Sequence, residues 1–189
     1  MTIPDETRQE CTDSALRCFG TAYIFERRAS PIRSRLRWLA FLGIAGPAAL
    51  GAIVATFNLN KTALTVAIGV AGLIGIGQLI ISIWSLVAHW DDSLAYDIES
   101  MSVNYRLAGD YSKLGKAQSL TPQEFDVQFR VLEAEAGLRT GLDQRQDLTD
   151  REKRMGMRAA LRQYGRACAA CKVVPVSLES TNCSVCGQF

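Results

Sequence analysis

The sequence predicts a mainly α-helical membrane protein with a two-helix transmembrane hairpin, cytosolic amphipathic helices and a small four-cysteine zinc ribbon at the carboxyl end. Residues 38–60 and 62–90 contain no Asp, Glu, Lys or Arg, although the 189 residues include 21 Lys plus Arg and 19 Asp plus Glu. Each run exceeds the roughly 20 apolar residues that a helix needs to cross a bilayer core. Amphipathic patterns flank the runs, and two CxxC pairs end the chain. We therefore divide the chain into residues 1–37, 38–90, 91–165 and 166–189.

Lys61 separates the two apolar runs and predicts a turn between two antiparallel membrane helices, about 38–57 and 63–88. A lysine at a bilayer centre costs about 2.5–3.5 kcal/mol, so Lys61 is expected at an interface. Asn58 and Asn60 favour the turn. Arginines crowd the entry to the first run, at Arg27, Arg28, Arg33, Arg35 and Arg37. The positive-inside rule then predicts a multi-pass protein of the cell membrane with both termini in the cytosol.

The second membrane helix has one small and polar face, and two interpretations of it are open. Its members are Ala67, Ala71, Gly75, Gln78, Ser82, Ser85 and His89. Small residues permit close helix packing and polar ones seek partners, so the face can pack within the hairpin or a dimer. It can also line a pore in an oligomer. Neither span contains a ring of charge, so strong ion selectivity is not expected.

Helical spacing predicts a buried face on both sides of the hairpin. Before it, the face consists of Cys11, Ala15, Cys18, Ala22 and Phe25. Ser30 followed by Pro31 predicts a new helix that enters the membrane. After the hairpin, the second membrane helix is expected to continue to about Leu114. Its cytosolic stripe comprises Leu94, Ile98, Met101, Tyr105 and Ala108.

Two capping boxes predict the remaining helices. Thr121 with Glu124 starts one helix, and Thr149 with Glu152 starts a last helix that ends near Tyr164. The first has the apolar stripe Phe125, Phe129, Leu132 and Ala136. The last helix and its exit carry a basic face: Arg151, Lys153, Arg154, Arg158, Arg162 and Arg166. This face is either a solvated surface beside an anionic membrane or a site for a phosphate-bearing partner, nucleotide or nucleic acid. No interleaved aromatic residues support base stacking.

The tail contains Cys168 and Cys171, then eleven residues, then Cys183 and Cys186. Paired CxxC units have the ligand spacing of a tetrahedral zinc site made of four thiolates. Structural disulfides are rare in the reducing cytosol, which favours metal. Four cysteines leave no open position for water, so the zinc is structural rather than hydrolytic. Gly187 follows the second pair and is expected to adopt the positive φ that such a turn often needs.

These features together resemble the SLATT superfamily of two-transmembrane effectors, and in particular a subgroup found on mobile elements and named after its CxxC-x11-CxxC ending. The matching segments are residues 19–26 (FGTAYIFE), 83–88 (IWSLVA) and 153–160 (KRMGMRAA), together with the cysteines. The resemblance implies a bacterial inner-membrane effector in conflict or antiviral (anti-phage) systems. Such proteins are thought to form pores and to respond to a nucleotide signal or to a partner protein from the same locus.

The leading prediction is therefore an effector that homo-oligomerises and disrupts the cell membrane on a signal. The alternative is a membrane-tethered binding module whose zinc ribbon recruits nucleic acid or a partner protein. A plain scaffold is a third class. An enzyme is not expected, because the chain has a single histidine and no Ser/His/Asp set, P-loop or dinucleotide-binding fingerprint.

Overall fold

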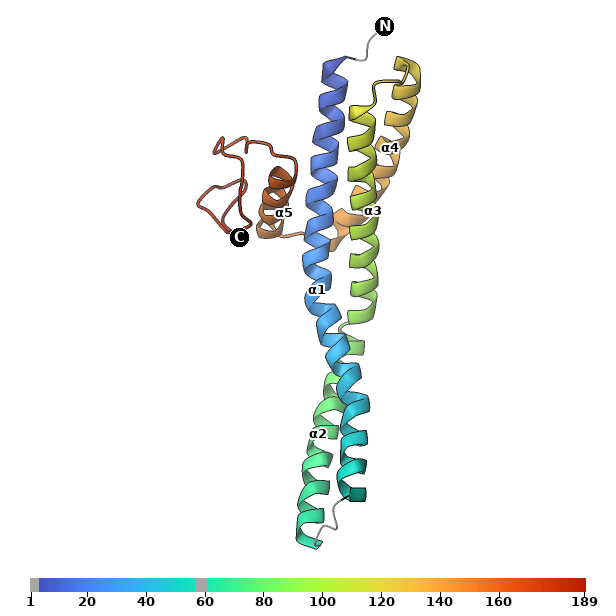
Figure 1. Cartoon of the computed structure of the whole chain (residues 1–189), viewed down its shortest axis with the longest axis vertical. Coiled ribbons are helices and arrows are strands. Elements are labelled where there is room, and N and C mark those ends of the chain that lie inside the picture. The colour runs from blue at the N-terminus through green and yellow to red at the C-terminus, as the bar shows by residue number, and fades with distance from the viewer. Residues whose placement is uncertain (1–3, 57–60) are drawn as a thin grey trace. The chain divides into compact units, whose positions relative to one another are not determined.

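The computed structural model describes residues 4–56 and 61–189, and the predicted turn at residues 57–60 lies outside this part. The elements in chain order are α1 (Asp5–Thr56), α2 (Lys61–Val87), α3 (Trp90–Lys116), α4 (Pro122–Asp143), the 3-10 turn η1 (Gln144–Gln146) and α5 (Asp150–Gln163) (Figure 1). The described residues contain no β-strand, so the predicted zinc ribbon is a cysteine tail of turns and loops.

The chain divides into two compact units. One, here called the core unit, combines Met1–Arg28 with Tyr96–Phe189, and the other, the apolar unit, is Ala29–Ala95. Helices α1 and α3 each contribute to both units. Each unit is described separately below.

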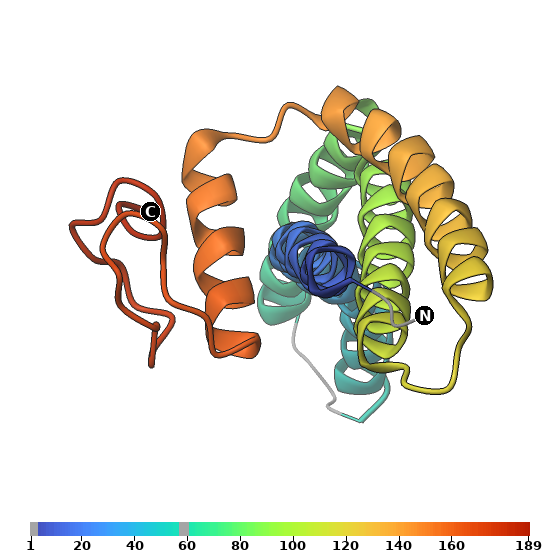
Figure 2. The same ribbon diagram turned by 90° about the horizontal axis from the view of Figure 1, so that it is seen from above.

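Within the core unit, the first part of α1 lies between α3 and α4 on one side and α5 on the other (Figures 1 and 2). The predicted face of α1 is confirmed, since all five of its members are buried: Cys11, Ala15, Cys18, Ala22 and Phe25. Three of them, Cys11, Ala15 and Cys18, pack in one cluster with Leu107, Tyr111 and Leu114 of α3 and with Phe125 of α4. Small side chains on α1 allow the large ones of its neighbours to come close.

Both predicted capping boxes are confirmed. At the start of α4, the backbone N–H of Thr121 donates to Glu124 Oε2 at 2.9 Å and the N–H of Glu124 donates to Thr121 Oγ1 at 3.3 Å. Thr149 and Glu152 exchange the same pair of bonds at the start of α5, at 2.9 and 3.3 Å. These exchanges satisfy N–H groups that the first helical turn leaves without partners.

The predicted helix start at Ser30 and Pro31 is wrong, because α1 runs through Pro31 without a break. Pro31 lacks an N–H and so removes one backbone hydrogen bond. The preceding turns are already helical, and adding a residue to an existing helix costs less than nucleating a new one. The local capping signal is therefore overridden.

The predicted single helix from residue 63 to Leu114 is also wrong. Helix α2 ends at Val87, and α3 begins at Trp90 after a turn in which His89 has a φ of 50°. A left-handed residue cannot continue an α-helix. The N–H of His89 bonds instead to the carbonyl of Leu86 at 3.2 Å, which closes the end of α2.

The buried face of α3 differs from the predicted stripe. Of the predicted residues Leu94, Ile98, Met101, Tyr105 and Ala108, only Ala108 is buried. Apart from Ala108, the buried residues repeat at spacings of three and four on a neighbouring face and include polar residues: Asp97, Ser100, Asn104, Leu107, Tyr111 and Leu114.

A carboxylate of α4 explains why polar side chains are buried in α3. Asp143 accepts hydrogen bonds from Ser100 Oγ and Asn104 Nδ2, each at 2.8 Å. Its Oδ1 also accepts from Tyr96 Oη at 2.8 Å and from Arg139 Nε at 3.0 Å. Buried polar groups are tolerated when they are hydrogen-bonded, so this network replaces apolar contact between α3 and α4.

The apolar unit contains the second part of α1, all of α2 and the first turn of α3. Among the described residues, one helical stretch, Leu64–Val87, is long and apolar enough to cross a membrane. Its large side chains are exposed; Leu73 is 72% and Leu86 70% exposed. Arg35 lies over the ring of Trp90 at 5.7 Å, which joins α1 to the start of α3 at one end of this unit.

Candidate metal centre

The structure brings the four tail cysteines together. The Sγ atoms of Cys168 and Cys183 are 3.9 Å apart, those of Cys171 and Cys186 are 3.8 Å apart, and all four lie within 4.8 Å of one another. Each of the two short distances joins one CxxC pair to the other. All four are free thiols, since these separations far exceed the roughly 2.05 Å of a disulfide bond.

The donor set fits a structural zinc ion. Zn–S bonds of about 2.3 Å in a tetrahedron place neighbouring sulfurs about 3.8 Å apart, close to the two short distances here. Cys168, Cys171, Cys183 and Cys186 would hold the ion and complete its coordination. The zinc supplies folding free energy to a tail that has little apolar core of its own.

The two cysteine turns share one backbone hydrogen bond but differ in the position of the residue with positive φ. The N–H of Lys172 donates to the carbonyl of Cys168, and the N–H of Gly187 donates to the carbonyl of Cys183, each at 2.9 Å. The positive φ falls on Lys172 (59°) and Gln188 (57°), so its predicted place at Gly187 is wrong. Glycine is required there for a different reason, because a Cβ would overlap the backbone carbonyl of Thr181.

Local hydrogen bonds and burial move the pKa values of individual cysteines in opposite directions, and burial raises the pKa of the tail residue Cys186 to about 12. The backbone N–H groups of Cys186 and Val185, which point at the sulfur of Cys183, lower the pKa of Cys183 to about 6. Burial raises the pKa of Cys11 and of Cys18 to about 11. Burial therefore leaves Cys11 and Cys18 as inert thiols. The case for metal in the tail rests on the clustering of its four sulfur atoms.

Arg158 of α5 fixes the tail to the helices. Its side chain is only 6% exposed, and its Nε donates to the Ser177 carbonyl at 2.8 Å. Its Nη1 donates to Thr181 Oγ1 at 3.3 Å and to the Cys186 carbonyl at 3.4 Å. Two residues of the segment between the CxxC pairs and one of the four cysteines therefore accept hydrogen bonds from a single buried cation.

The predicted basic face is consequently not one surface. Arg158 is buried in the tail, and Arg166 pairs with Asp13 of α1. Lys153 lies 3.5 Å from Asp150, and Arg154 donates to the carbonyl of Gln188 at 3.4 Å. Arg151 and Arg162 are exposed. A phosphate-binding cluster of all six cations is not formed, because half of them serve the fold of this corner.

Apolar contacts support the same attachment. Cys168 and Cys186 are buried against Leu16 of α1 and against Ala160 and Leu161 of α5. Phe19 and Tyr164, whose rings meet edge-to-face at 5.9 Å, contact both this cluster and the main helical core. The metal centre is thus continuous with the core unit.

One structural ion pair was not predicted from the sequence. Arg28, counted above only as a topological charge, donates to both carboxylate oxygens of Glu152, at 2.5 and 2.7 Å. It also donates to the carbonyls of Gln146 and Asp147, at 2.8 and 3.2 Å. Arg28 therefore holds the α4–α5 connection to α1. No spacing rule relates two residues so far apart in the chain.

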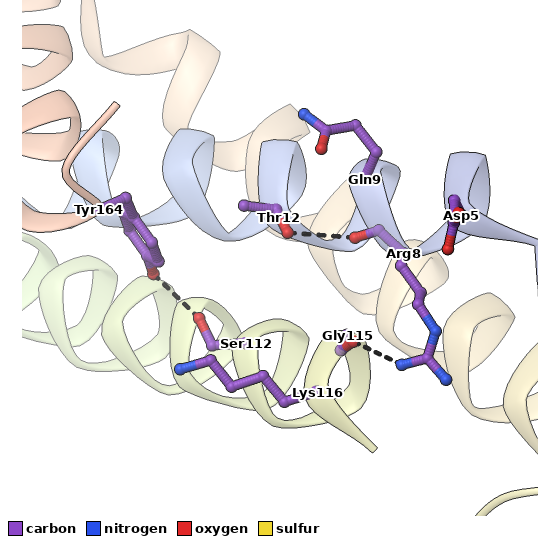
Figure 3. Close-up of a pocket in the computed structure, with 8 residues that line it drawn as sticks. All are labelled: Asp5, Arg8, Gln9, Thr12, Ser112, Gly115, Lys116 and Tyr164. Atoms are coloured by element: carbon purple, nitrogen blue, oxygen red, sulfur yellow. Dashed lines mark hydrogen bonds between the residues drawn. The ribbon is translucent and has the colours of Figure 1, made fainter. Parts of the chain in front are cut away.

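A pocket of about 320 Å³ lies where the start of α1 meets the end of α3 (Figure 3). Arg8 Nη1 donates to the carbonyl of Gly115 at 2.8 Å, and the hydroxyls of Ser112 and Tyr164 are 3.2 Å apart. These polar groups bond to one another rather than converging on the cavity. Arg8 thereby caps the carboxyl end of α3, where a cation opposes the helix dipole favourably.

The predicted small and polar face of α2 is turned partly inward in the apolar unit. Ser85 is buried, Ala67, Ala71, Gln78 and Ser82 are half-buried, and Gly75 and His89 are exposed. A Cβ at Gly43 would lie 2.8 Å from Gln78 Nε2, so the Gln78 amide lies directly on α1. His89 Nδ1 lies 3.2 Å from Asp92 Oδ2.

These observations define a helical protein that combines a four-cysteine structural zinc site with a long apolar helix. A family model described as Mobilome CxxCx(11)CxxC protein matches residues 8–189, nearly the whole chain. The chain belongs to this family, as the spacing of its cysteines indicates. Neither the curated proteins nor the solved structures contain a match.

Proposed function

We propose that the protein is a membrane effector of mobile genetic elements that acts in bacterial conflict, including defence against phage. The observation that carries the proposal is the distribution of side chains in the apolar unit. Leu73, Ile76 and Leu86 of α2 are exposed, whereas Gln78 and Ser85 face inward. This is the distribution expected of helices surrounded by lipid, where polar groups find partners between helices.

We take residues 38–56 of α1 as a crossing in addition to that of α2. The protein is then a two-span hairpin of the inner membrane with cytosolic termini. The arginines before this run and the single Lys61 after it support that orientation. The resemblance to SLATT effectors supports the further step, in which several copies assemble into a pore. A signal, either a nucleotide or a partner protein from the same locus, would start the assembly.

The inward polar face suggests how a closed state is kept. Gln78 lies on Gly43 of the same chain, so its amide is not available to line a path for ions. Opening would release Gln78 from α1 and turn it, with Ser82 on the same face, toward other copies. The cytosolic part, including the cysteine tail, would control this step.

Membrane potential provides the test. Induced expression of the full chain in bacteria should depolarise the cells, as followed with a potential-sensitive dye. Gln78→Leu combined with Ser82→Leu should abolish depolarisation at equal membrane levels. Leu79→Ile combined with Ile83→Leu changes exposed positions of the same helix and should leave it intact. Equal depolarisation by both double variants would refute a pore lined by this face.

A tethered binding module is the second candidate, because the cysteine tail exposes apolar side chains. Val173 is 61% and Val176 85% exposed, next to a rigid zinc site. Such a surface suits recruitment of a partner protein to the membrane. If expression never depolarises cells, and Val176→Asp prevents a photo-crosslink formed by a probe at Val173, the tethered module becomes the better proposal.

A further inference from the structure

Helix α4 has two apolar faces on opposite sides. The inner face packs on the core through Phe125, Phe129, Leu132 and Ala136. The outer face is exposed and comprises Val127 (61%), Val131 (61%), Ala134, Leu138 (76%) and Leu142 (44%). A helix needs only one apolar face to pack on its own core, so the second requires another explanation.

The spacing of the outer face is that of a helix–helix seam. Val127, Val131, Ala134 and Leu138 follow one another at intervals of four, three and four. This is the a/d pattern with which one helix packs along another. The ion pairs beside it, Asp126 with Arg130 and Arg106 with Glu135, are already satisfied within one chain.

The two ends of the outer face are complementary in shape. Its first half borders a groove of about 490 Å³ between α3 and α4, lined in part by Leu114, Ala117, Leu120, Val127 and Val131. Its second half instead presents the prominent side chains of Leu138 and Leu142. An antiparallel copy would set Leu142 opposite Val127 and Leu138 opposite Val131, so that leucines of each copy enter the groove of the other.

The charges at the two ends of the outer face also favour antiparallel docking. Glu124 stands one turn before Val127, and Arg145 follows Leu142. The backbone N–H of Thr121 lowers the pKa of Glu124 below its usual value, which keeps this carboxylate ionised. Antiparallel docking places Glu124 opposite Arg145 of the second copy at both ends, whereas parallel docking places like charges together.

We propose that the outer face of α4 docks a second copy of this chain, antiparallel, about a two-fold axis that passes between residues 134 and 135, beside Ala134. The interface is isologous, since each copy supplies one groove and one pair of leucines. This dimer does not depend on the proposed pore, because α4 belongs to the core unit and the contact requires no lipid. It also uses a surface other than the small and polar face of α2 and the apolar stripe predicted for residues 94–108.

Single cysteines in the full chain, in the membranes of expressing cells, test the geometry. Ala134→Cys should form a covalent dimer with a short thiol crosslinker, because the two copies of residue 134 meet beside the axis. Val127→Cys alone should not, whereas Val127→Cys combined with Leu142→Cys should. The unmodified chain, treated in the same way, gives the background of crosslinking by its native cysteines. Efficient crosslinking of Val127→Cys with itself would mean parallel packing and would overturn the proposal.

Leu138→Glu tests the energetics at a position exposed in a single copy, so it should fold and retain its metal. The purified variant should have half the mass of the unmodified protein by light scattering after subtraction of detergent. Val176→Glu, an equally exposed change in the tail, should remain dimeric. A monomeric unmodified protein or a dimeric Leu138→Glu would overturn the proposal. Depolarisation of cells is measured in a separate experiment. A negative result for the dimer is therefore distinguishable from a negative result for the pore.

Discussion

Arg158 is an arginine that the helical pattern assigns to an exposed basic face, and the structure uses it to hold the metal-binding tail. Its three acceptors are Ser177, Thr181 and Cys186, and its side chain is 6% exposed. Removing this buried charged donor leaves its acceptors without partners, which costs about 1–3 kcal/mol of stability. The residue therefore matters to stability rather than to an anionic ligand.

Arg158→Ala should accordingly lower the melting temperature by about 2–12 °C, because each kcal/mol lost corresponds to about 2–4 °C in a chain of this size. Zinc should also be lost faster to a chelator. Arg162→Ala, on the exposed side of the same helix, is the matched control and should change neither quantity. Equal effects of the two substitutions would show that charge, not the buried contact, is responsible.

Metal content tests the four cysteines themselves. Cys183→Ser should reduce bound zinc from one equivalent to near zero by elemental analysis, because three thiolates no longer close the tetrahedron. The tail should then become sensitive to protease, while α1, α3 and α4 keep their helical signal. Cys11→Ala removes a thiol whose pKa is raised to about 11 by burial, so it should retain the zinc. No zinc in protein purified without chelator would refute the site.

The ionisation of Asp97 makes the free energy of unfolding depend on pH. Burial, together with the nearby Glu152 and against the attraction of Arg28, raises the pKa of Asp97 to about 6 from 3.8. The folded protein therefore binds this proton before the unfolded chain does. Between about pH 6 and pH 4 the Asp97 contribution to stability grows as pH falls, and above pH 6 the buried charge is destabilising.

Asp97→Asn removes that charge and should raise the free energy of unfolding by about 1–3 kcal/mol at pH 7.5, as judged from the size of the shift. Near pH 4 the difference from the unmodified protein should largely disappear. Denaturant unfolding at both pH values measures it, and comparing the two proteins at each pH cancels titration elsewhere. A difference that is constant with pH would mean that Asp97 acts by packing alone.

Among the elements, the crossing of α1 and α5 depends on two glycines. A Cβ at Gly156 would lie 2.6 Å from the carbonyl oxygen of Gly20 and 2.8 Å from Ile24 Cγ1. Backbone cannot move aside as a flexible side chain can, so the two helices would have to separate. Such overpacking costs about 1–3 kcal/mol.

Gly156→Ala should therefore lower stability and loosen α5 with its attached tail. Gly109→Ala in α3 has no atom within 4 Å of the added Cβ and should stabilise the protein by up to about 1 kcal/mol through helix propensity. Thermal unfolding of the two variants should move in opposite directions. A stabilised Gly156→Ala would show that the helices have room at this crossing.

The elements that the sequence predicted well are those specified by local chemistry. Both capping boxes, the apolar faces of α1 and α4, and the four-cysteine cluster each depend on residues close in sequence or on one ligand type. The buried face of α3 was missed because Ser100 and Asn104 are polar, and their burial depends on Asp143 some forty residues later. The break at His89 was missed because a left-handed residue that is not glycine has no clear local signal.

At the scale of the whole molecule, the two units differ in the sequence features that specify them. Hydrophobic length alone indicates the apolar unit, since Leu64–Val87 is recognised by composition. The core unit instead requires contacts between distant segments, such as Arg28 with Glu152 and Arg166 with Asp13. Those pairs join the first helix to the last, and no periodicity within either segment indicates them.

The orientation of the chain in the membrane is the remaining whole-molecule prediction. Five arginines precede the first apolar run and one lysine lies between the runs, so the positive-inside rule places both termini in the cytosol. An impermeant maleimide should therefore label Asn60→Cys in intact spheroplasts but label Thr2→Cys only after permeabilisation. The native cysteines should give little background, because two are buried thiols and four are zinc ligands on the protected side. Labelling of Thr2→Cys in intact cells, with Asn60→Cys protected, would reverse the orientation. The zinc site would then face the oxidising exterior, where paired cysteines form disulfides more readily than they retain metal.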